Sequence, residues 1–321
     1  HNAWVTTAGE KMSKSLGNTA LVSEVTQQYE PRAVRLYLVA PHYRSVTAAD
    51  GTELRFHFVD EGPRDAAPIL LLHGNPSWSY LHRHMVRGLA DLGHRVLALD
   101  LMGMGRSDKP AARSDYTLAN HVDWMGQWLE GEDLAGVTLY CQDWGGLTGL
   151  QLLPDHGDRV DRVLASNTGI PVGEGVNRFM QQWLDFSQSV TELPIGSLVA
   201  GGTSRTLTPE EQAAYDAPFP DGTYQTSALQ FPLLIPLQPD NPGVPQSKAT
   251  WAYLATWEKP FLTVFGSEDA IAYKPGAHVR FQEVVPGAQG QPHEVIEGAN
   301  HFIQEDASER LIEVLHAFTG A

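Results

Sequence analysis

Residues 137–151 read VTLYCQDWGGLTGLQ, an apolar run followed by Asp143 and then by small and apolar residues. This order predicts a strand, a sharp turn and a helix, the context in which some folds present a nucleophilic side chain at the tip of a strand. Such a turn usually carries a serine between two glycines, whereas the apex here is an aspartate. Gly145 and Gly146 provide the small residues that so tight a turn requires. The alternative for Asp143, taken alone, is a simple helix cap.

Strand-like and helix-like stretches alternate from about residue 46 onward, which predicts a mostly parallel sheet with helices on both faces. Together with the turn at Asp143, this alternation predicts the α/β-hydrolase fold with eight strands. The first strand belongs to a hairpin turned at Asp50-Gly51, and the others are expected within 53–62, 68–74, 94–105, 136–146, 160–170, 260–269 and 292–301.

The stretch 172–250 breaks this alternation, because it has no clean strand and is rich in proline, glycine and aromatic residues. We interpret it as a helical cap inserted after the sixth core strand. The hydrolase core is then expected at 46–171 and 251–321.

The composition limits the kinds of partner. The chain has 22 Lys and Arg against 38 Asp and Glu, a net charge of −16. Such a charge repels phosphate backbones and anionic membranes, so we expect neither nucleic acid nor a membrane as a partner. No apolar run approaches the roughly 18 residues of a membrane span.

The single cysteine, Cys141, cannot form an intrachain disulfide and fits a reducing compartment, so we expect a cytoplasmic protein. It follows an apolar run and has no basic neighbour in sequence, which predicts a buried structural thiol and not a nucleophile. The sequence contains no cluster of metal ligands and no dinucleotide-binding fingerprint. We therefore expect no metal and no cofactor, and we expect a monomer.

Residues 1–45 do not follow the alternating pattern. The stretch HNAWVTTAGEKMSKSLGN, with Lys-Met-Ser-Lys-Ser at 11–15, resembles a fragment of class I aminoacyl-tRNA synthetases, most closely cysteinyl-tRNA synthetase. In that family the loop contacts ATP together with an upstream His-x-Gly-His motif on a nucleotide-binding fold, and the sequence predicts neither. We therefore expect a non-functional leader that is dispensable up to about residue 40.

The partners of Asp143 are expected in the order nucleophile, acid, histidine. His301 follows the last predicted strand, where the fold places its catalytic histidine. Asp269 follows the preceding strand, three residues after Gly266, and Glu268 is the alternative acid. The remaining histidines beyond the cap lie at positions less suited to catalysis: His278, His293 and His316.

A further landmark is LLHGNPSWSY at 71–80, which follows a strand where this fold builds half of its oxyanion hole. The backbone N–H groups of Asn75 and Trp144 are expected to converge near the nucleophile. The absence of any Gly-x-Ser-x-Gly in the chain argues against an esterase or lipase. A carboxylate that attacks an alkyl carbon displaces a halide or opens an epoxide, and histidine-activated water then hydrolyses the ester.

Residues from about 42 to 319 resemble the haloalkane dehalogenases of the α/β-hydrolase superfamily. The resemblance rests on HGNPSWSYL, CQDWGG, AAYDAPFPDGTYQ and GANHFIQED, which begin at residues 73, 141, 213 and 298. It implies hydrolysis of a halogenated alkane through an aspartyl ester, with water as co-substrate and a halide ion as product. One branch of the family has a glutamate after the sixth strand. This chain has Asn167 there, which favours the branch that uses Asp269.

In that family the tryptophan after the nucleophile donates its indole N–H to the halide, and Trp144 matches it. The second donor is a cap tryptophan or an asparagine. The resemblance to the Asp269 branch favours Trp183 over Asn75, although Asn75 is expected nearby. Epoxide hydrolase is the alternative function, since similar enzymes share Asp-Trp-Gly-Gly. The cap tyrosines that would donate its proton are Tyr215 and Tyr224.

Overall fold

The computed structural model describes residues 6–7, 10–11 and 42–320, in two compact units, 1–42 and 43–321. In the first unit, β1 (Thr6–Thr7) pairs with β2 (Glu10–Lys11) in an antiparallel arrangement. Most of the predicted synthetase-like leader, including 12–41, lies outside the described residues.

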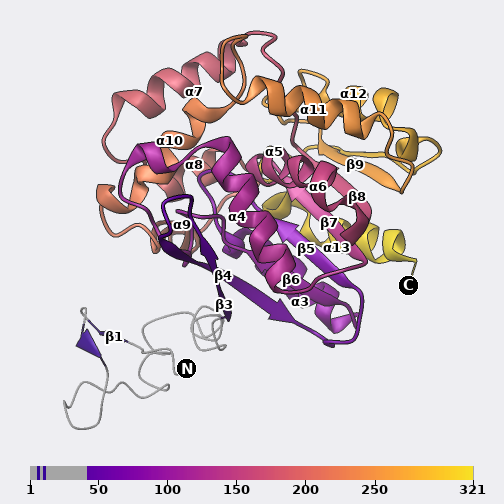
Figure 1. Ribbon diagram of the computed structural model, residues 1–321, viewed down its shortest axis with the longest axis horizontal. Helices are drawn as coiled ribbons and strands as arrows, with labels where there is room; N and C mark the ends of the chain where they lie inside the picture. Colours follow the sequence, from indigo (N-terminus) through magenta and orange to yellow (C-terminus); the bar gives the residue numbers. More distant parts are fainter. Residues whose placement is uncertain (1–5, 8–9, 12–41, 321) are drawn as a thin grey trace. The chain divides into compact units, whose positions relative to one another are not determined.

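The second unit is built on one eight-stranded sheet with the order β10-β9-β8-β7-β5-β6-β4-β3 (Figure 1). Neighbouring strands from β6 to β10 run parallel, and β4 is antiparallel to β6. The strands are β3 (His42–Thr47), β4 (Glu53–Glu61), β5 (Pro68–Leu72), β6 (Arg95–Leu99), β7 (Val137–Gln142), β8 (Val160–Ser166), β9 (Phe261–Gly266) and β10 (Glu294–Ile296). The predicted α/β-hydrolase fold is confirmed.

The start of the sheet differs from the prediction. Residues 42–45 were assigned to the leader, but they form most of β3, which is the edge strand beside β4. Along β3 only Val46 is fully buried. So weakly apolar an edge strand gives little sequence signal, which explains the shifted boundary.

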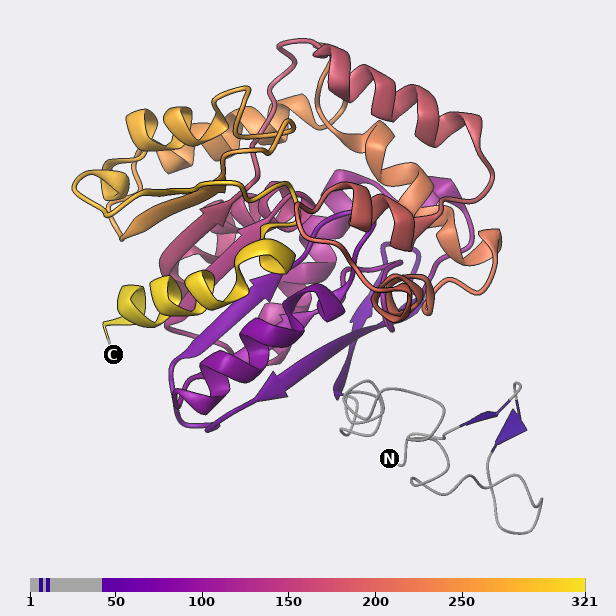
Figure 2. The same cartoon turned by 180° about the vertical axis from the view of Figure 1, so that it is seen from behind.

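Helices cover both faces of the sheet (Figures 1 and 2). On one face lie α3 (Arg83–Asp91) and α13 (Ile303–Thr319). The other face carries α4 (Leu118–Gly131), α5 (Trp144–Gly149), α6 (Leu153–His156), α11 (Val244–Leu254) and α12 (Ala277–Val284).

The central strands are buried on both sides, and alternate residues contribute to two different hydrophobic clusters. On β5, Ile69 and Leu71 belong to the cluster of α3 and α13, whereas Leu70 and Leu72 belong to that of α4 and α5. Strands buried on both faces read as continuous apolar runs, which is why β5, β7 and β9 were recognised in the sequence.

The cap follows β8, the sixth strand of the sheet, as predicted. It contains α7 (Arg178–Ser189), α8 (Ile195–Gly201), α9 (Pro209–Asp216) and α10 (Thr226–Leu234), and none of its described residues forms a strand. The last residues assigned to the cap, 244–250, instead begin α11, which contacts α6 of the core.

A buried charged cluster joins the cap to the core. The carboxylate of Glu305, on α13, accepts hydrogen bonds from Arg83 of α3 at 2.5 and 2.9 Å, and from Arg205 and the hydroxyl of Tyr215 in the cap. Glu211 of α9 pairs with Arg83 at 3.0 Å and with Arg205 at 2.8 Å. The Glu305 side chain has no exposed surface, and its neighbours satisfy its charge.

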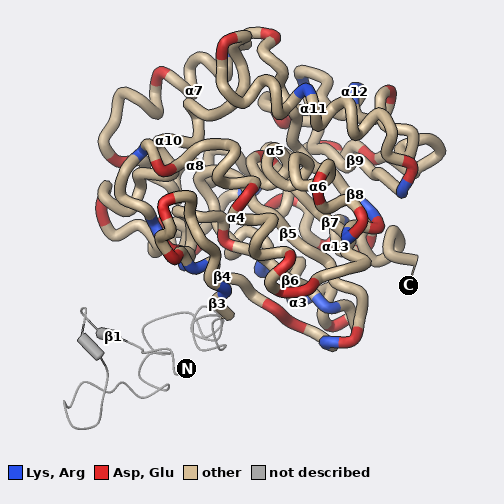
Figure 3. Tube along the Cα trace, in the orientation of Figure 1, with Lys and Arg blue, Asp and Glu red and all other residues tan. Residues whose placement is uncertain are grey.

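Charged residues lie mainly on the helices and loops around the sheet (Figure 3). The strands β5, β7 and β9 contain none. Among residues 42–320, no helix combines the length and the apolar character needed to cross a bilayer.

Candidate active site

Asp143 lies at the tip of the turn between β7 and α5, with φ +51° and ψ −120°. A positive φ is strained for a residue with a side chain, and such strain is found at functional turns. A Cβ atom on Gly145 would lie 2.3 Å from the carbonyl oxygen of Leu72, so no larger residue fits there. The carboxylate of Asp143 makes no capping hydrogen bond to α5, which argues against the simple helix-cap interpretation.

The structure brings Asp143, His301 and Asp269 together from three separate segments. His301 Nε2 lies 3.5 Å from Asp143 Oδ2, and His301 Nδ1 lies 3.1 Å from Asp269 Oδ1. The alternative acid, Glu268, instead forms an exposed ion pair with Lys274 at 3.1 Å. Of the two candidate acids, Asp269 is therefore the one that contacts the imidazole.

The Asp269 carboxylate is fully buried, and protein N–H groups donate hydrogen bonds to it. It accepts backbone hydrogen bonds from Ile271 at 2.9 Å and from Ala272 at 3.1 Å. Burial alone would raise the pKa of Asp269, but His301 and these N–H groups outweigh it and lower the pKa. Asp269 is accordingly ionised and holds the proton on Nδ1 of His301.

His301 lies between two carboxylates. Burial opposes its charged form, but the charges of Asp269 and Asp143 outweigh that effect and raise the pKa of His301 to about 10. The imidazole therefore carries a proton at neutral pH.

The other candidate side chains are engaged elsewhere. His293 accepts the N–H of Thr263, His278 stacks on Tyr273, and His316 pairs with His94. Cys141 is fully buried, and burial raises the pKa of its thiol.

One half of the expected oxyanion hole is formed. The backbone N–H of Asn75 donates to Asp143 Oδ1 at 2.8 Å. Gly74 permits this approach, since a Cβ atom there would lie 2.2 Å from the same oxygen. Asp143 Oδ2 is left to face His301. The backbone N–H of Trp144, at the first position of α5, stays a predicted donor.

The three candidate halide donors lie in different surroundings. Trp144 is buried, its ring is edge-on to Phe231 at 4.3 Å, and its indole N–H has no partner among the described residues. Asn75 is also buried, and its Oδ1 has no hydrogen-bond partner within the described part of the chain. Trp183 lies on α7 of the cap, where its ring is partly exposed and contacts Phe186. The structure thus places Asn75 and Trp144 directly beside Asp143, whereas Trp183 is on the cap.

The two tyrosines proposed as proton donors for an epoxide lie in different surroundings. Tyr215 is fully buried, and its hydroxyl donates to Glu305 in the cap–core cluster. Tyr224 is 44% exposed.

The structure adds two polar residues that sequence reasoning did not assign to the site. The amide of Gln142 contacts both the ring and the main chain of His301. Asn167, where another branch carries an acid, donates to the carbonyl oxygens of Asn300 at 2.8 Å and His301 at 3.0 Å. It also accepts the N–H of Gly266 at 2.8 Å. The sequence did contain a signal for both residues. Each is a polar residue at or just after the end of a buried strand, and a buried polar side chain requires a hydrogen-bond partner.

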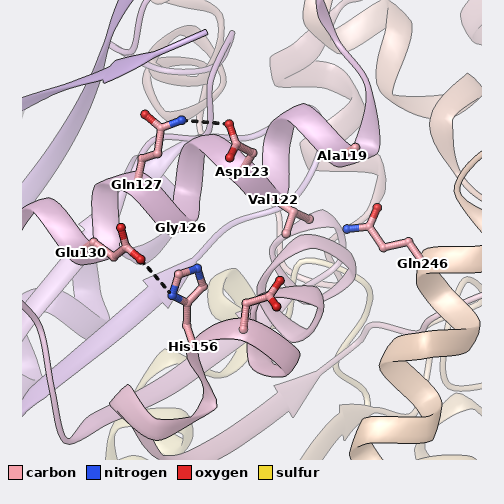
Figure 4. Close-up of a pocket in the computed structure, with 9 residues that line it drawn as sticks. Ala119, Val122, Asp123, Gly126, Gln127, Glu130, His156 and Gln246 are labelled. Atoms are coloured by element: carbon pink, nitrogen blue, oxygen red, sulfur yellow. Dashed lines mark hydrogen bonds and ion pairs between the residues drawn. The ribbon is translucent and has the colours of Figure 1, made fainter. Parts of the chain in front are cut away.

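A surface pocket is lined by residues of α4, α6 and α11 (Figure 4). Glu130 and His156 point toward each other there, with 3.7 Å between the carboxylate and Nδ1. No member of the triad and none of the candidate halide donors lines it. No three His, Cys, Asp or Glu side chains in the described part of the chain are arranged to hold a metal ion.

Comparison with known proteins agrees with this geometry. Residues 67–308 match the family model of the alpha/beta hydrolase fold, and residues 1–56 match that of the class I (C) tRNA synthetase catalytic domain. The chain is 46% identical to a haloalkane dehalogenase of Psychrobacter cryohalolentis, over 88% of this chain and 93% of that protein. It is 48% identical to a haloalkane dehalogenase of Mycobacterium marinum, over 86% and 93%.

A solved structure is similar over the same region. It is a haloalkane dehalogenase of Paraglaciecola agarilytica NO2, with a TM-score of 0.78, 35% identity and coverage of 86% of this chain and 91% of that one. That relative is described as tetrameric, and our expectation of a monomer stays a prediction.

Proposed function

The chain belongs to the haloalkane dehalogenases of the α/β-hydrolase fold, and on that basis we propose that it cleaves carbon–halogen bonds through a covalent ester on Asp143. The observation that carries this mechanism is the arrangement of the two carboxylate oxygens. Oδ1 is held by the N–H of Asn75, and Oδ2 is open toward His301.

In the first step, Asp143 Oδ2 attacks the carbon that bears the halogen. A carbon–oxygen bond forms, and the electron pair of the carbon–halogen bond leaves with the halide. The charge therefore moves from the carboxylate to the halide, and N–H donors beside the leaving group stabilise it in a pocket with little water.

Trp144 is the first of these donors, because its side chain is buried next to Asp143 and its indole N–H has no hydrogen-bond partner among the described residues. Trp183 or the side-chain amide of Asn75 supplies the second. The family resemblance favours Trp183. The position of Asn75 favours Asn75 instead, because its backbone N–H donates a hydrogen bond to the Asp143 carboxylate.

In the second step, His301 takes a proton from water, and the water oxygen attacks the carbonyl carbon of the ester. Backbone N–H groups of Asn75 and Trp144 hold the oxyanion. The bond between that carbon and the alkoxide oxygen then breaks, and the alcohol leaves with the proton from His301. Esterification removes the charge of Asp143, which is one of two causes of the high pKa of His301. His301 therefore becomes a base once the ester has formed.

The alternative, epoxide hydrolysis, requires a proton donor for the departing alkoxide. The hydroxyl of Tyr215 is already hydrogen-bonded to Glu305, and the side chain of Tyr224 is 44% exposed to solvent. This arrangement supports a halide over an epoxide oxygen as the leaving group.

The test is bromide release from 1,2-dibromoethane and 1-bromobutane, followed by an epoxide panel. We expect the parent protein to release bromide and Asp143→Ala to release none. His301→Ala should retain the alkyl group as an adduct on the peptide that contains Asp143, seen by mass spectrometry. Bromide release by Asp143→Ala, or diol from epoxides without bromide from haloalkanes, would overturn the proposal.

A further inference from the structure

Gln142 is a buried polar residue immediately before the nucleophile. It ends β7, has no exposed surface and pairs with Ser166 of β8 in the sheet. Its amide nitrogen donates to the carbonyl oxygen of His301 at 3.1 Å and lies 3.3 Å from Nε2 of the His301 ring. Its Oε1 is buried and has no hydrogen-bond partner among residues 42–320. In the described part of the chain, the side chain of Gln142 therefore has hydrogen-bond contacts with His301 alone.

The orientation of this amide is determined by its partners. A carbonyl oxygen is only an acceptor, so the NH₂ group of Gln142, and not its oxygen, must face the main chain of His301. The same NH₂ group then presents its second hydrogen to the ring. A donor facing Nε2 favours the imidazole in which Nε2 carries a lone pair.

That form of His301 is the one required to take a proton from water. The charged groups that face the His301 ring are Asp269 at Nδ1 and Asp143 at Nε2. The neutral side chain of Asn167 contacts the main chain of His301 and not its ring. Both carboxylates favour the protonated ring. Gln142 is thus the one side chain contacting this ring that opposes a proton on Nε2, among the residues that the structure describes.

We propose that Gln142 is a positioning residue for ester hydrolysis, which holds the main chain of His301 and keeps Nε2 of its ring as an acceptor. This inference rests on the proposed ester mechanism. It assigns Gln142 no part in the first step, because the amide contacts neither the nucleophilic oxygen nor the halide donors.

The test uses Gln142→Glu, which has nearly the same shape and places a carboxylate against Nε2, and Gln142→Met, which removes both hydrogen bonds. Rapid-quench mass spectrometry with 1-bromobutane measures formation and decay of the alkyl-enzyme between pH 5 and pH 10. We expect adduct formation to stay near the parent rate in both variants. We expect the pH at which decay becomes half-maximal to rise slightly in Gln142→Met and strongly in Gln142→Glu. Decay at pH 7 slows by about tenfold for each unit of that rise, and the adduct accumulates.

Gln304→Glu is the matched control, since Gln304 is also a fully buried glutamine near a histidine, with 3.5 Å between its Nε2 and that of His82. We expect no shift of the decay profile in this variant. Thermal unfolding checks that each variant is folded. If Gln142→Glu does not fold, the test is made with Gln142→Met alone.

The outcomes separate the two proposals. Decay profiles at the parent pH in both Gln142 variants would overturn the role of Gln142 while leaving the ester mechanism intact. A shift of the decay profile in Gln304→Glu as large as that in Gln142→Glu would also overturn the role of Gln142. Absence of any alkyl-enzyme in the parent would instead overturn the ester mechanism itself.

Discussion

Replacing Arg83 by methionine tests whether the buried charged cluster holds the cap on the core. The change leaves the fully buried carboxylate of Glu305 with Arg205 and the hydroxyl of Tyr215 as partners. Removing one partner of a buried ion pair costs about 3–5 kcal/mol. Because Arg205 remains, we expect the lower end of that range for the loss in free energy of unfolding. At about 2 °C per kcal/mol for a domain of this size, the midpoint of thermal unfolding falls by about 6 °C.

Arg87→Met is the control, because Arg87 lies one turn later on the same helix. Its ion pair with Asp91 spans 3.8 Å, and the two side chains are 68% and 74% exposed. Exposed pairs of this kind contribute about 0–1 kcal/mol, so the midpoint should move by no more than about 2 °C. Circular dichroism melts of the parent and both variants make the comparison. Equal shifts for Arg83→Met and Arg87→Met would refute the reasoning.

The same cluster gives a pH signature. Burial raises the pKa of Glu305, but hydrogen bonds and charge from Arg83, with Tyr215 and Arg205, outweigh it and lower the pKa below its ordinary value of 4.5. Stability that comes from a lowered pKa is present above pH 4.5 and is lost as the pH falls below it. The difference in stability between the parent and Arg83→Met should therefore narrow below pH 4.5.

Two further predictions concern the catalytic site. In Asp143→Asn the pKa of His301, about 10 in the parent, should fall toward its ordinary value of 6.5, since one of its two carboxylates is gone; NMR titration of the imidazole measures it. A raised pKa contributes stability that is lost as the pH rises through 10, so the stability of the parent and of Asp143→Asn should converge between pH 7 and pH 10. For the second halide donor, bromide titration should show about tenfold or greater weakening in Trp183→Phe if the cap donor operates. Unchanged affinity in that variant, with weakening in Asn75→Ala, would transfer the role to Asn75.

The sheet and the triad were predictable for physical reasons that differ. The central strands are buried on both faces, so their apolar runs stand out, whereas β3 has one fully buried residue and its start was misplaced. Asp143, Asp269 and His301 were predictable because each must follow the end of a particular strand, which chain order reveals.

Contacts between distant polar residues were not predictable. Arg83 and Glu305 are 222 positions apart, and each by itself reads as an ordinary surface charge. Gln142 stands beside a conspicuous motif, but its amide acquires a role only when the loop that carries His301 folds against β7. The predicted donor role of Trp183 likewise depends on how α7 lies over the core, which local patterns do not encode.

The link between cap and core has a consequence for recombination among related enzymes. An exchange of residues 172–250 alone would replace the cap residues that contact Arg83 and Glu305. Arg83 and Glu305 themselves would still come from the recipient enzyme, because they lie outside the exchanged segment. Asp306 adds to this dependence, since it accepts N–H groups of Ser204 and Arg205 from the cap and of Asn300 from the loop of the catalytic histidine. We therefore expect functional chimeras to be those whose crossovers keep the cap, α3 and α13 from one parent.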